Sequence, residues 1–217
     1  MVFLPRLDIL PPPQHRLWPE LSAMPPHFVL YGGTAIALHL GHRVSVDFDF
    51  FSDCAFDPDQ LATSLPFLAN SQVIQKAENT LTSLIDREGP VQISFFGVPH
   101  LRRLQPPLVV SDHGLRIASL LDLAGMKAAV VQKRAEAKDY FDLDALIVSG
   151  QVDLSMALAA GCAIYGPVFN PQISLKALCY FGDGNLPTLP ETVKNRLVEA
   201  VRAIDLDHLP TLIPEPP

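Results

Sequence analysis

Residues 28–51 read FVLYGGTAIALHLGHRVSVDFDFF, and this stretch decides the fold. Its first four residues are apolar and stop at a Gly-Gly pair, which predicts a buried strand followed by a tight turn. The residues that follow are mostly good helix formers, with Thr34 as the expected N-cap and Gly41 as the expected left-handed residue that ends the helix. The pattern therefore predicts a strand, a Gly-Gly turn and a short helix.

Residues 43–51 alternate between apolar and polar side chains. The apolar set is Val44, Val46, Phe48 and Phe50, and the polar set is Arg43, Ser45, Asp47 and Asp49. Because successive side chains of a strand point to opposite faces, the alternation predicts a strand over residues 43–51 with one dry side and one acidic side.

Asp47 and Asp49 are the strongest candidates for chemistry. Carboxylates two residues apart on a strand point to the same side, where they can share a divalent cation such as Mg²⁺ or Mn²⁺. The turn at Gly32-Gly33 brings bare backbone and a helix N-terminus to one place, which suits the phosphates of a nucleotide. The alternative is that both aspartates lie on the solvated face of an edge strand and that the glycines only make a turn. The spacing of the two features favours a combined metal and nucleotide site.

The rest of the chain changes from strand patterning to helical patterning. A helix is expected over residues 57–68, and residues 79–85 and 91–96 are expected to form a hairpin around a turn that ends in Gly89. A capping box at Ser119 opens a series of predicted helices. They cover residues 119–133, 135–149, 154–160, 175–180 and 190–204. The expected fold class is α+β, with a small mixed β-sheet flanked by helices and a helical C-terminal region.

Composition narrows the function classes. Of the 217 residues, 48% are apolar and 18% are charged, so the chain does not have the composition of a disordered protein. The net charge of -7 argues against holding nucleic acid by overall positive charge, so an RNA would need a local basic patch. Candidates for that patch are Arg102, Arg103, Lys133, Arg134 and Lys138. Three cysteines without a CxxC pair indicate a cytoplasmic protein, and no export signal or membrane span is expected.

Two segments resemble the AbiEii/AbiGii toxin family, within the DNA polymerase beta-like nucleotidyltransferase superfamily. Residues 31–51 are similar to the first motif of that family, and residues 117–127, Arg134 and residues 138–143 are similar to its later helical motifs. The resemblance implies transfer of a nucleotidyl group from an NTP, with Mg²⁺, to tRNA or another cellular acceptor. It also implies a bacterial toxin with a separately encoded antitoxin. Seven prolines fall within the first 26 residues, so this segment is expected to be an irregular arm. The expected domains are this proline-rich arm (1–26), a nucleotidyltransferase core (27–112) and a helical C-terminal region (113–217).

Lys127 is the one charge in an apolar helical stretch, so its ammonium group is expected either to extend to solvent or to meet a buried anion. The resemblance implies that it contacts the nucleotide phosphates, together with the motif residues Gly32, Gly33, Thr34 and Ser45. Asp139 and Asp142 are three residues apart and are expected on one helical face. The resemblance further implies that one of these two acids completes the acidic site or positions Lys127. Asp139 is the first choice and Asp142 the second.

One departure from the superfamily affects the metal site. A third metal-binding carboxylate is often found on a later strand, but the expected inward positions here are Gln92 and Ser94. This absence motivates an alternative function, an inactive nucleotide-binding or interaction module of the same fold. A small-molecule nucleotidyltransferase is a further alternative, since that class shares the first motif. His39 and His42 lack zinc spacing and are expected to have surface or core roles.

Overall fold

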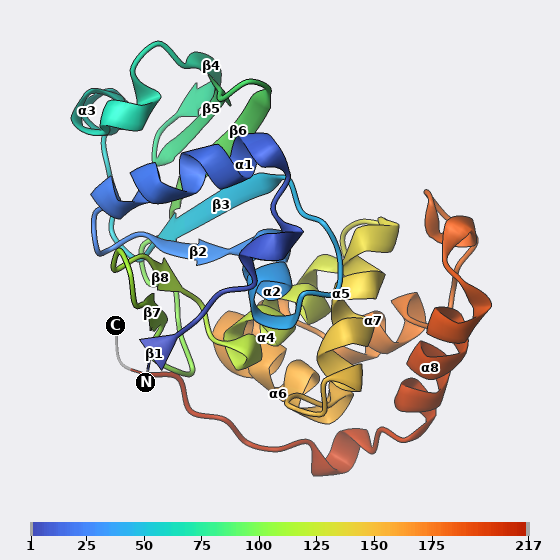
Figure 1. The fold of residues 1–217 in the computed structure, drawn as a ribbon. Helices are drawn as coiled ribbons and strands as arrows, with labels where there is room; N and C mark the ends of the chain where they lie inside the picture. Colours follow the sequence, from blue (N-terminus) through green and yellow to red (C-terminus); the bar gives the residue numbers. More distant parts are fainter. Residues whose placement is uncertain (1, 216–217) are drawn as a thin grey trace. The chain divides into compact units, whose positions relative to one another are not determined.

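A computed structural model describes residues 2–215 (Figure 1). The chain divides into two compact units. The first contains the chain up to Leu101 together with Pro106–Ala118, and the second contains Arg102–Gln105 and the chain from Ser119 onward. The division therefore falls after Ala118, a few residues later than the expected boundary after residue 112, and the N-terminal segment belongs to the first unit.

The first unit is built on a mixed sheet of eight strands within the described residues, in the order β1-β7-β8-β2-β3-β6-β5-β4. The strands are β1 (Val2–Phe3), β2 (Val29–Tyr31), β3 (Asp47–Ser52), β4 (Gln72–Ala77), β5 (Thr80–Asp86), β6 (Pro90–Gly97), β7 (Leu108–Val110) and β8 (Arg116–Ile117). Strand β3 lies inside the sheet, antiparallel to β2 and parallel to β6. The predicted hairpin is confirmed as β5 and β6.

Helical segments accompany this sheet. They are η1 (Leu7–Ile9), α1 (Pro12–Leu17), η2 (Trp18–Ala23), α2 (Gly32–Leu40), α3 (Pro58–Ser64) and η3 (Pro66–Leu68), where η marks a 3₁₀ helix. Helix α2 ends as predicted, with Gly41 in the left-handed conformation at φ 67°. The predicted helix over 57–68 is divided into α3 and η3, because Pro66 cannot continue a helix.

The prediction that the first 26 residues form an irregular arm is wrong. Prolines at the start of α1 begin that helix instead of preventing it, since proline is tolerated in the first turn. Leu17, Trp18 and Leu21 are buried. The Trp18 ring lies 6.4 Å from the ring of Phe48 and 4.9 Å from that of His113, measured between centroids. Trp18 therefore packs this segment onto the sheet of the first unit.

Strand β3 begins at Asp47 and not at Arg43, so the prediction of a longer strand is wrong. The Val44 and Val46 side chains, expected on the dry side, are 61% and 49% exposed. The reason lies in the neighbouring strands, because β6 begins to pair with β3 at Asp47 and β2 pairs only with its later residues. Residues 43–46 therefore pair with neither β2 nor β6.

Strand β4 was not expected from the sequence. It is the last strand of the sheet, and all six of its residues are exposed, so it has no alternation of buried and exposed side chains. Its pairing with β5 also shifts register between Val73 and Gln75. A strand of this kind has little hydrophobic pattern to reveal it.

The second unit is helical, as predicted for the C-terminal region. Its helical segments are α4 (Leu120–Val130), α5 (Ala137–Val148), α6 (Leu154–Tyr165), η4 (Gly166–Val168), α7 (Pro171–Ala177), η5 (Leu186–Thr188), α8 (Glu191–Arg202) and η6 (Leu206–His208). Helix α7 begins earlier than the predicted range of 175–180, because Asn170 caps it: the Asn170 side chain accepts a hydrogen bond from the Gln172 backbone N–H. No helix within residues 2–215 is long and apolar enough to span a membrane.

Helices α4 and α6 pack at close range in the second unit. A Cβ atom at Gly125 would lie 2.8 Å from the Cβ atom of Ala160, so only glycine fits at this crossing. Ser119 caps α4 as predicted, since its hydroxyl oxygen accepts a hydrogen bond from the Asp122 backbone N–H at 3.1 Å. The cap and the close packing fix the position of α4, which carries Lys127.

Candidate functional site

Asp47 and Asp49 lie on one face of β3, and both are half-buried. Phe48 and Phe50 point to the opposite face and are fully buried. In the register with β6, Asp47 lies beside Gln92 and Asp49 beside Ser94. The two carboxylates therefore share a face with the amide and hydroxyl side chains that the sequence places where a third acid would stand.

Gly32 lies directly against Asp49. Its φ of 74° is in the left-handed region, and a Cβ atom on it would lie 2.7 Å from Asp49 Oδ2. Pairing of Tyr31 with Asp49 in the ladder between β2 and β3 brings the start of α2 to this position. The structure thus places bare backbone at a helix N-terminus next to one of the two carboxylates, which is the arrangement expected from the sequence.

Thr34 has a different local role from the expected N-cap. The N-cap of α2 is Tyr31, because the helix already begins at Gly32. The Thr34 hydroxyl donates a hydrogen bond to the Asp47 carbonyl oxygen and lies 2.8 Å from Ser45 Oγ. Thr34 and Ser45 are both buried, so their hydroxyls connect α2 to the segment that enters β3. This contact fixes the backbone at Asp47.

Gln14 holds the same segment from α1. Its side chain is 3% exposed, and its Nε2 donates a hydrogen bond to the Val46 carbonyl oxygen at 2.8 Å. No feature of the sequence pointed to Gln14, because it lies in the proline-rich segment and 32 positions before Val46. The entry to β3 is therefore held by two distant polar side chains, Gln14 and Thr34.

Lys127 forms a buried cluster with acids of α5 in the second unit. Its Nζ lies 2.6 Å from Asp139 Oδ1 and 2.7 Å from Asp142 Oδ2. The Lys127 side chain is 6% exposed and both carboxylates are fully buried. Of the two outcomes that the sequence left open for Lys127, contact with a buried anion is the one found, and the anions are these carboxylates.

Arg134 completes the charge balance of this cluster. Its Nε donates to Asp139 Oδ2 at 2.7 Å and its Nη2 to Asp139 Oδ1 at 3.1 Å. Burial by itself would raise the pKa of Asp139, but the hydrogen bond from Arg134 and the charge of Lys127 outweigh it and hold that pKa below its usual value. Two cations thus face two carboxylates, and Asp139 binds both cations.

The predicted basic patch is divided by these ion pairs. Arg134 is bound to Asp139, and Lys138 Nζ lies 3.0 Å from a Glu136 carboxylate oxygen. Lys133 is exposed and has no ion pair with any residue in the described part of the chain. The patch therefore retains much less unbalanced positive charge than the sequence suggests.

Asp122 is a buried acid with a separate role. Its carboxylate accepts hydrogen bonds from the backbone N–H groups of Leu104 and Gln105 at 2.7 and 3.2 Å, and from the Ser119 hydroxyl at 2.5 Å. Burial raises its pKa above the usual value despite these bonds. The capping box marked this residue in the sequence, but its contact with the 102–105 segment depends on the tertiary structure.

His39 is half-buried in the first unit and has a packing role there. Its Nε2 donates to the Ala118 carbonyl oxygen at 2.9 Å, and its ring lies 4.5 Å from the ring of Phe3. Among the described residues, no three His, Cys, Asp or Glu side chains gather in a way that could hold a metal ion. Asp47 and Asp49 offer two carboxylates, and Mg²⁺ commonly takes one or two carboxylates together with substrate phosphates and water.

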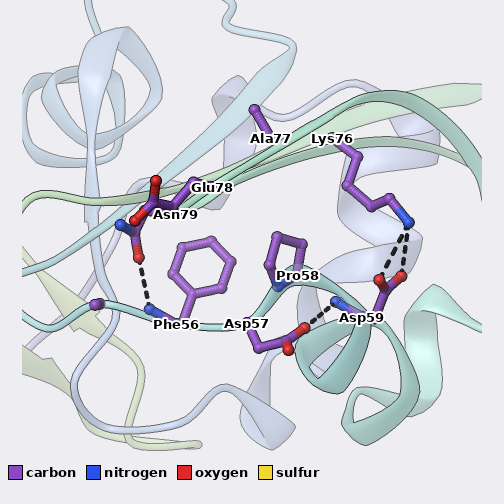
Figure 2. Close-up of a pocket in the computed structure, with 9 residues that line it drawn as sticks. Phe56, Asp57, Pro58, Asp59, Lys76, Ala77, Glu78 and Asn79 are labelled. Atoms are coloured by element: carbon purple, nitrogen blue, oxygen red, sulfur yellow. Dashed lines mark hydrogen bonds and ion pairs between the residues drawn. The ribbon is translucent and has the colours of Figure 1, made fainter.

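One cavity of the first unit lies apart from these residues. It has a volume of about 670 Å³ and lies between the start of α3 and the turn that joins β4 to β5 (Figure 2). Asp57, Asp59 and Glu78 line it, and its one cationic side chain, Lys76, is bound to Asp59 at 2.8 Å (Figure 2). None of the predicted site residues lines this cavity, and its acidic lining is unsuited to phosphate.

Comparison with solved structures defines the class of protein. MenT4, a nucleotidyltransferase toxin of Mycobacterium tuberculosis, superimposes with a TM-score of 0.62 over 89% of this chain and 83% of its own, at 15% identity. A protein of Helicobacter pylori described as a nucleotidyltransferase superimposes with a TM-score of 0.52 over 88% of this chain and 92% of its own, at 16% identity. The chain has the fold of the nucleotidyltransferases.

Sequence comparison gives the family. Residues 16–208 match the family model described as "Nucleotidyl transferase AbiEii toxin, Type IV TA system". An uncharacterized protein of Aquifex aeolicus, aq_aa25, is 32% identical over 158 residues, which is 72% of this chain and 74% of that protein. The chain belongs to the AbiEii nucleotidyltransferase toxin family, and the resemblance found in the two sequence motifs is confirmed.

Proposed function

We propose that this protein transfers a nucleotidyl group from an NTP to a cellular acceptor, with Mg²⁺ or Mn²⁺ bound at Asp47 and Asp49. The observation that supports the proposal is the contact between Gly32 and Asp49, which brings a helix N-terminus and a carboxylate to one place. Backbone N–H groups at such a terminus bind phosphate, and carboxylates bind the accompanying cation. Membership of the toxin family supports this assignment.

In the proposed reaction, an acceptor hydroxyl oxygen forms a bond to the α-phosphorus of the NTP. The bond from that phosphorus to the bridging oxygen breaks, pyrophosphate leaves and the hydroxyl proton is released to water. A bound divalent cation supplies charge neutralisation on the phosphates. Gly32 and Gly33 offer backbone donors, while Thr34 and Ser45 hold the backbone at Asp47. The geometry of the two carboxylates thus depends on α2.

Lys127 is proposed to contact phosphate through the donor that its ion pairs leave over. An ammonium group has three N–H donors, and two of those of Lys127 are directed at Asp139 and Asp142. Asp139 and Asp142 are then positioning residues, since each binds Lys127 and both are fully buried. They are not proposed to bind the cation.

The acceptor, the partner and the compartment are also proposals. The family description names a toxin of a toxin-antitoxin system, which supports a separately encoded antitoxin and a bacterial host. RNA, with the 3′ end of tRNA as the first candidate, is the acceptor we propose. A cytoplasmic location follows from this substrate and from the absence of CxxC pairing among the three cysteines.

The test is incubation with each α-labelled NTP, Mg²⁺ and either total RNA or a protein lysate, with EDTA as the metal control. We expect label in RNA from the wild type and loss of labelling by Asp49→Asn, because that change removes a cation ligand. Asp112→Asn is the matched control, an exposed aspartate of the same unit, and it should label normally. Equal labelling by Asp49→Asn and the wild type would contradict the assigned chemistry.

An inactive nucleotide-binding module is a second candidate, favoured by Gln92 and Ser94 at the positions beside the two aspartates. Such a module would bind NTP in equilibrium dialysis but would transfer label to neither RNA, protein nor small molecules. Label found only in small molecules would instead support the antibiotic-modifying class of nucleotidyltransferase.

A further inference from the structure

The second unit contains a cavity outside the proposed catalytic residues, although Lys133 and Arg134 of the predicted basic patch line it. It has a volume of about 260 Å³ and lies between the turn after α4, helix α5 and the loop after α7. Tyr140 lies at its buried side, with its hydroxyl donating to the Ala177 carbonyl oxygen at 3.2 Å. Arg134 lines the cavity and binds Asp139, so the cavity borders the cluster around Lys127.

Tyr180 gives this cavity an exposed aromatic ring. Tyr180 is 58% exposed. A Cβ atom at Gly182 would lie 2.7 Å from Tyr180 Oη, so the ring rests against bare backbone. Asn185 Oδ1 accepts a hydrogen bond from the Ala137 backbone N–H at 2.7 Å, which joins the loop to the start of α5. The ring is therefore exposed and already in place, so that binding would order little of the chain.

Charged groups around the ring match the parts of a nucleotide. Lys133 lines the cavity without an ion pair among the described residues, so its ammonium group is available to a phosphate. Asp183 also lines it, and a carboxylate there can accept a hydrogen bond from the exocyclic amine of a base. Aromatic rings stack with any base, and proteins that bind single strands combine such stacking with positive charge along the backbone.

We propose that this cavity binds one nucleotide near the single-stranded 3′ end of the acceptor RNA, with the base on Tyr180 and a backbone phosphate at Lys133. The proposal rests on the proposed function for the identity of the acceptor. A single strand is favoured over a duplex because only an unstacked base can lie flat on a protein ring. It is favoured further because a chain with net charge -7 cannot hold a duplex backbone through its overall field.

The test measures RNA binding without NTP, by fluorescence anisotropy with a short fluorescein-labelled oligoribonucleotide ending in CCA-3′. Tyr180→Ala should weaken binding about 5- to 150-fold, the range for loss of one stacked base, whereas Tyr180→Phe should bind like the wild type. Lys133→Ala should reduce the slope of log affinity against log salt by about 0.7. Lys76→Ala, an exposed lysine of the other unit, is the charge-matched control and should leave the slope unchanged.

Two results would overturn the proposal. The first is RNA affinity that is unchanged in both Tyr180→Ala and Lys133→Ala. The second is a loss of affinity for a non-hydrolysable ATP analogue with RNA binding retained, which would assign the cavity to the NTP. Because these titrations involve no transfer, they are independent of the labelling test. If the protein transfers label to no acceptor but its RNA binding depends on Tyr180, the proposed nucleotidyl transfer is refuted and the proposed RNA site is supported.

Discussion

Lys127 Nζ lies 2.6 Å from Asp139 Oδ1, and both side chains are buried inside the second unit. Asp139 in turn binds Arg134, so one carboxylate joins a buried ammonium group to a guanidinium group that lines the Tyr180 cavity. Such a buried ion pair adds little net stability, because the cost of removing both charges from water offsets much of their attraction. Removing one partner, however, leaves the other charge buried.

Lys127→Met should therefore be strongly destabilising. The change leaves Asp139 and Asp142 without their shared ammonium group, and the expected loss is about 3–5 kcal/mol of unfolding free energy. Urea denaturation followed by circular dichroism measures it. Lys138→Met is the matched control on α5, since that lysine is half-exposed and pairs only with Glu136. A loss no larger than that of the control would contradict the buried cluster.

The same variant should have a distinctive pH dependence. The pKa of Asp139 is lowered in the folded protein, so its ion pairs stabilise the fold above the ordinary carboxyl pKa, near 3.8, and this contribution is lost as pH falls through the lowered value. The difference in stability between the wild type and Lys127→Met should narrow below about pH 4. Denaturation at a series of pH values tests this, and a constant difference would be the contrary result.

Gly32→Ala and Gly41→Ala form a matched pair. Both glycines have positive φ, 74° and 67°, so alanine should cost each about 1–2 kcal/mol of backbone strain. At Gly32 the new methyl group would also meet Asp49 Oδ2 at 2.7 Å, whereas at Gly41 it meets the flexible end of Arg6. We expect similar shifts of melting temperature but loss of nucleotidyl transfer only in Gly32→Ala. Equal transfer by both variants would separate Gly32 from the site.

His39 should make the first unit sensitive to mild acid. Burial lowers its pKa below 6.5 in the folded state, so the unfolded chain binds its proton more readily. The contribution of neutral His39 to the free energy of unfolding should be fully present above about pH 6.5. It should decrease as pH falls toward the lowered pKa, by at most about 1.4 kcal/mol per pH unit. His39→Gln should flatten this slope between pH 7 and 5. His15→Gln, an exposed histidine in α1, should leave it unchanged.

Arg196 should hold α8 to α5. Its Nε and Nη2 donate to the two carboxylate oxygens of Asp144 at 2.8 and 2.5 Å, but the guanidinium is 45% exposed, so the pair should contribute only about 1 kcal/mol. Arg196→Ala should accelerate hydrogen exchange in α8 while α4 stays protected. Arg202→Ala removes an arginine near the end of the same helix and should have no such effect.

Local sequence determined much of this fold. Several predicted features are found in the structure: the strand before Gly32, the β5–β6 hairpin, the capping box at Ser119 and the placement of Asp47 and Asp49 on one face. All of them depend on periods of two or 3.6 residues and on turn and capping chemistry. These features need no knowledge of distant residues. The resemblance to the toxin family, and not a local pattern, implied that Asp139 or Asp142 positions Lys127, and the structure brings both carboxylates to its ammonium group.

Tertiary structure decided the rest. Strand β3 begins at Asp47 because β6 begins to pair there, and no local pattern contains that register. Gln14 reaches Val46 across 32 positions from a segment that looked irregular, and the Tyr180 cavity combines a turn, a helix and a loop that are far apart in the sequence. The physical reason is that hydrogen bonds and cavities depend on distance in space, whereas the sequence shows periodicity only between neighbours.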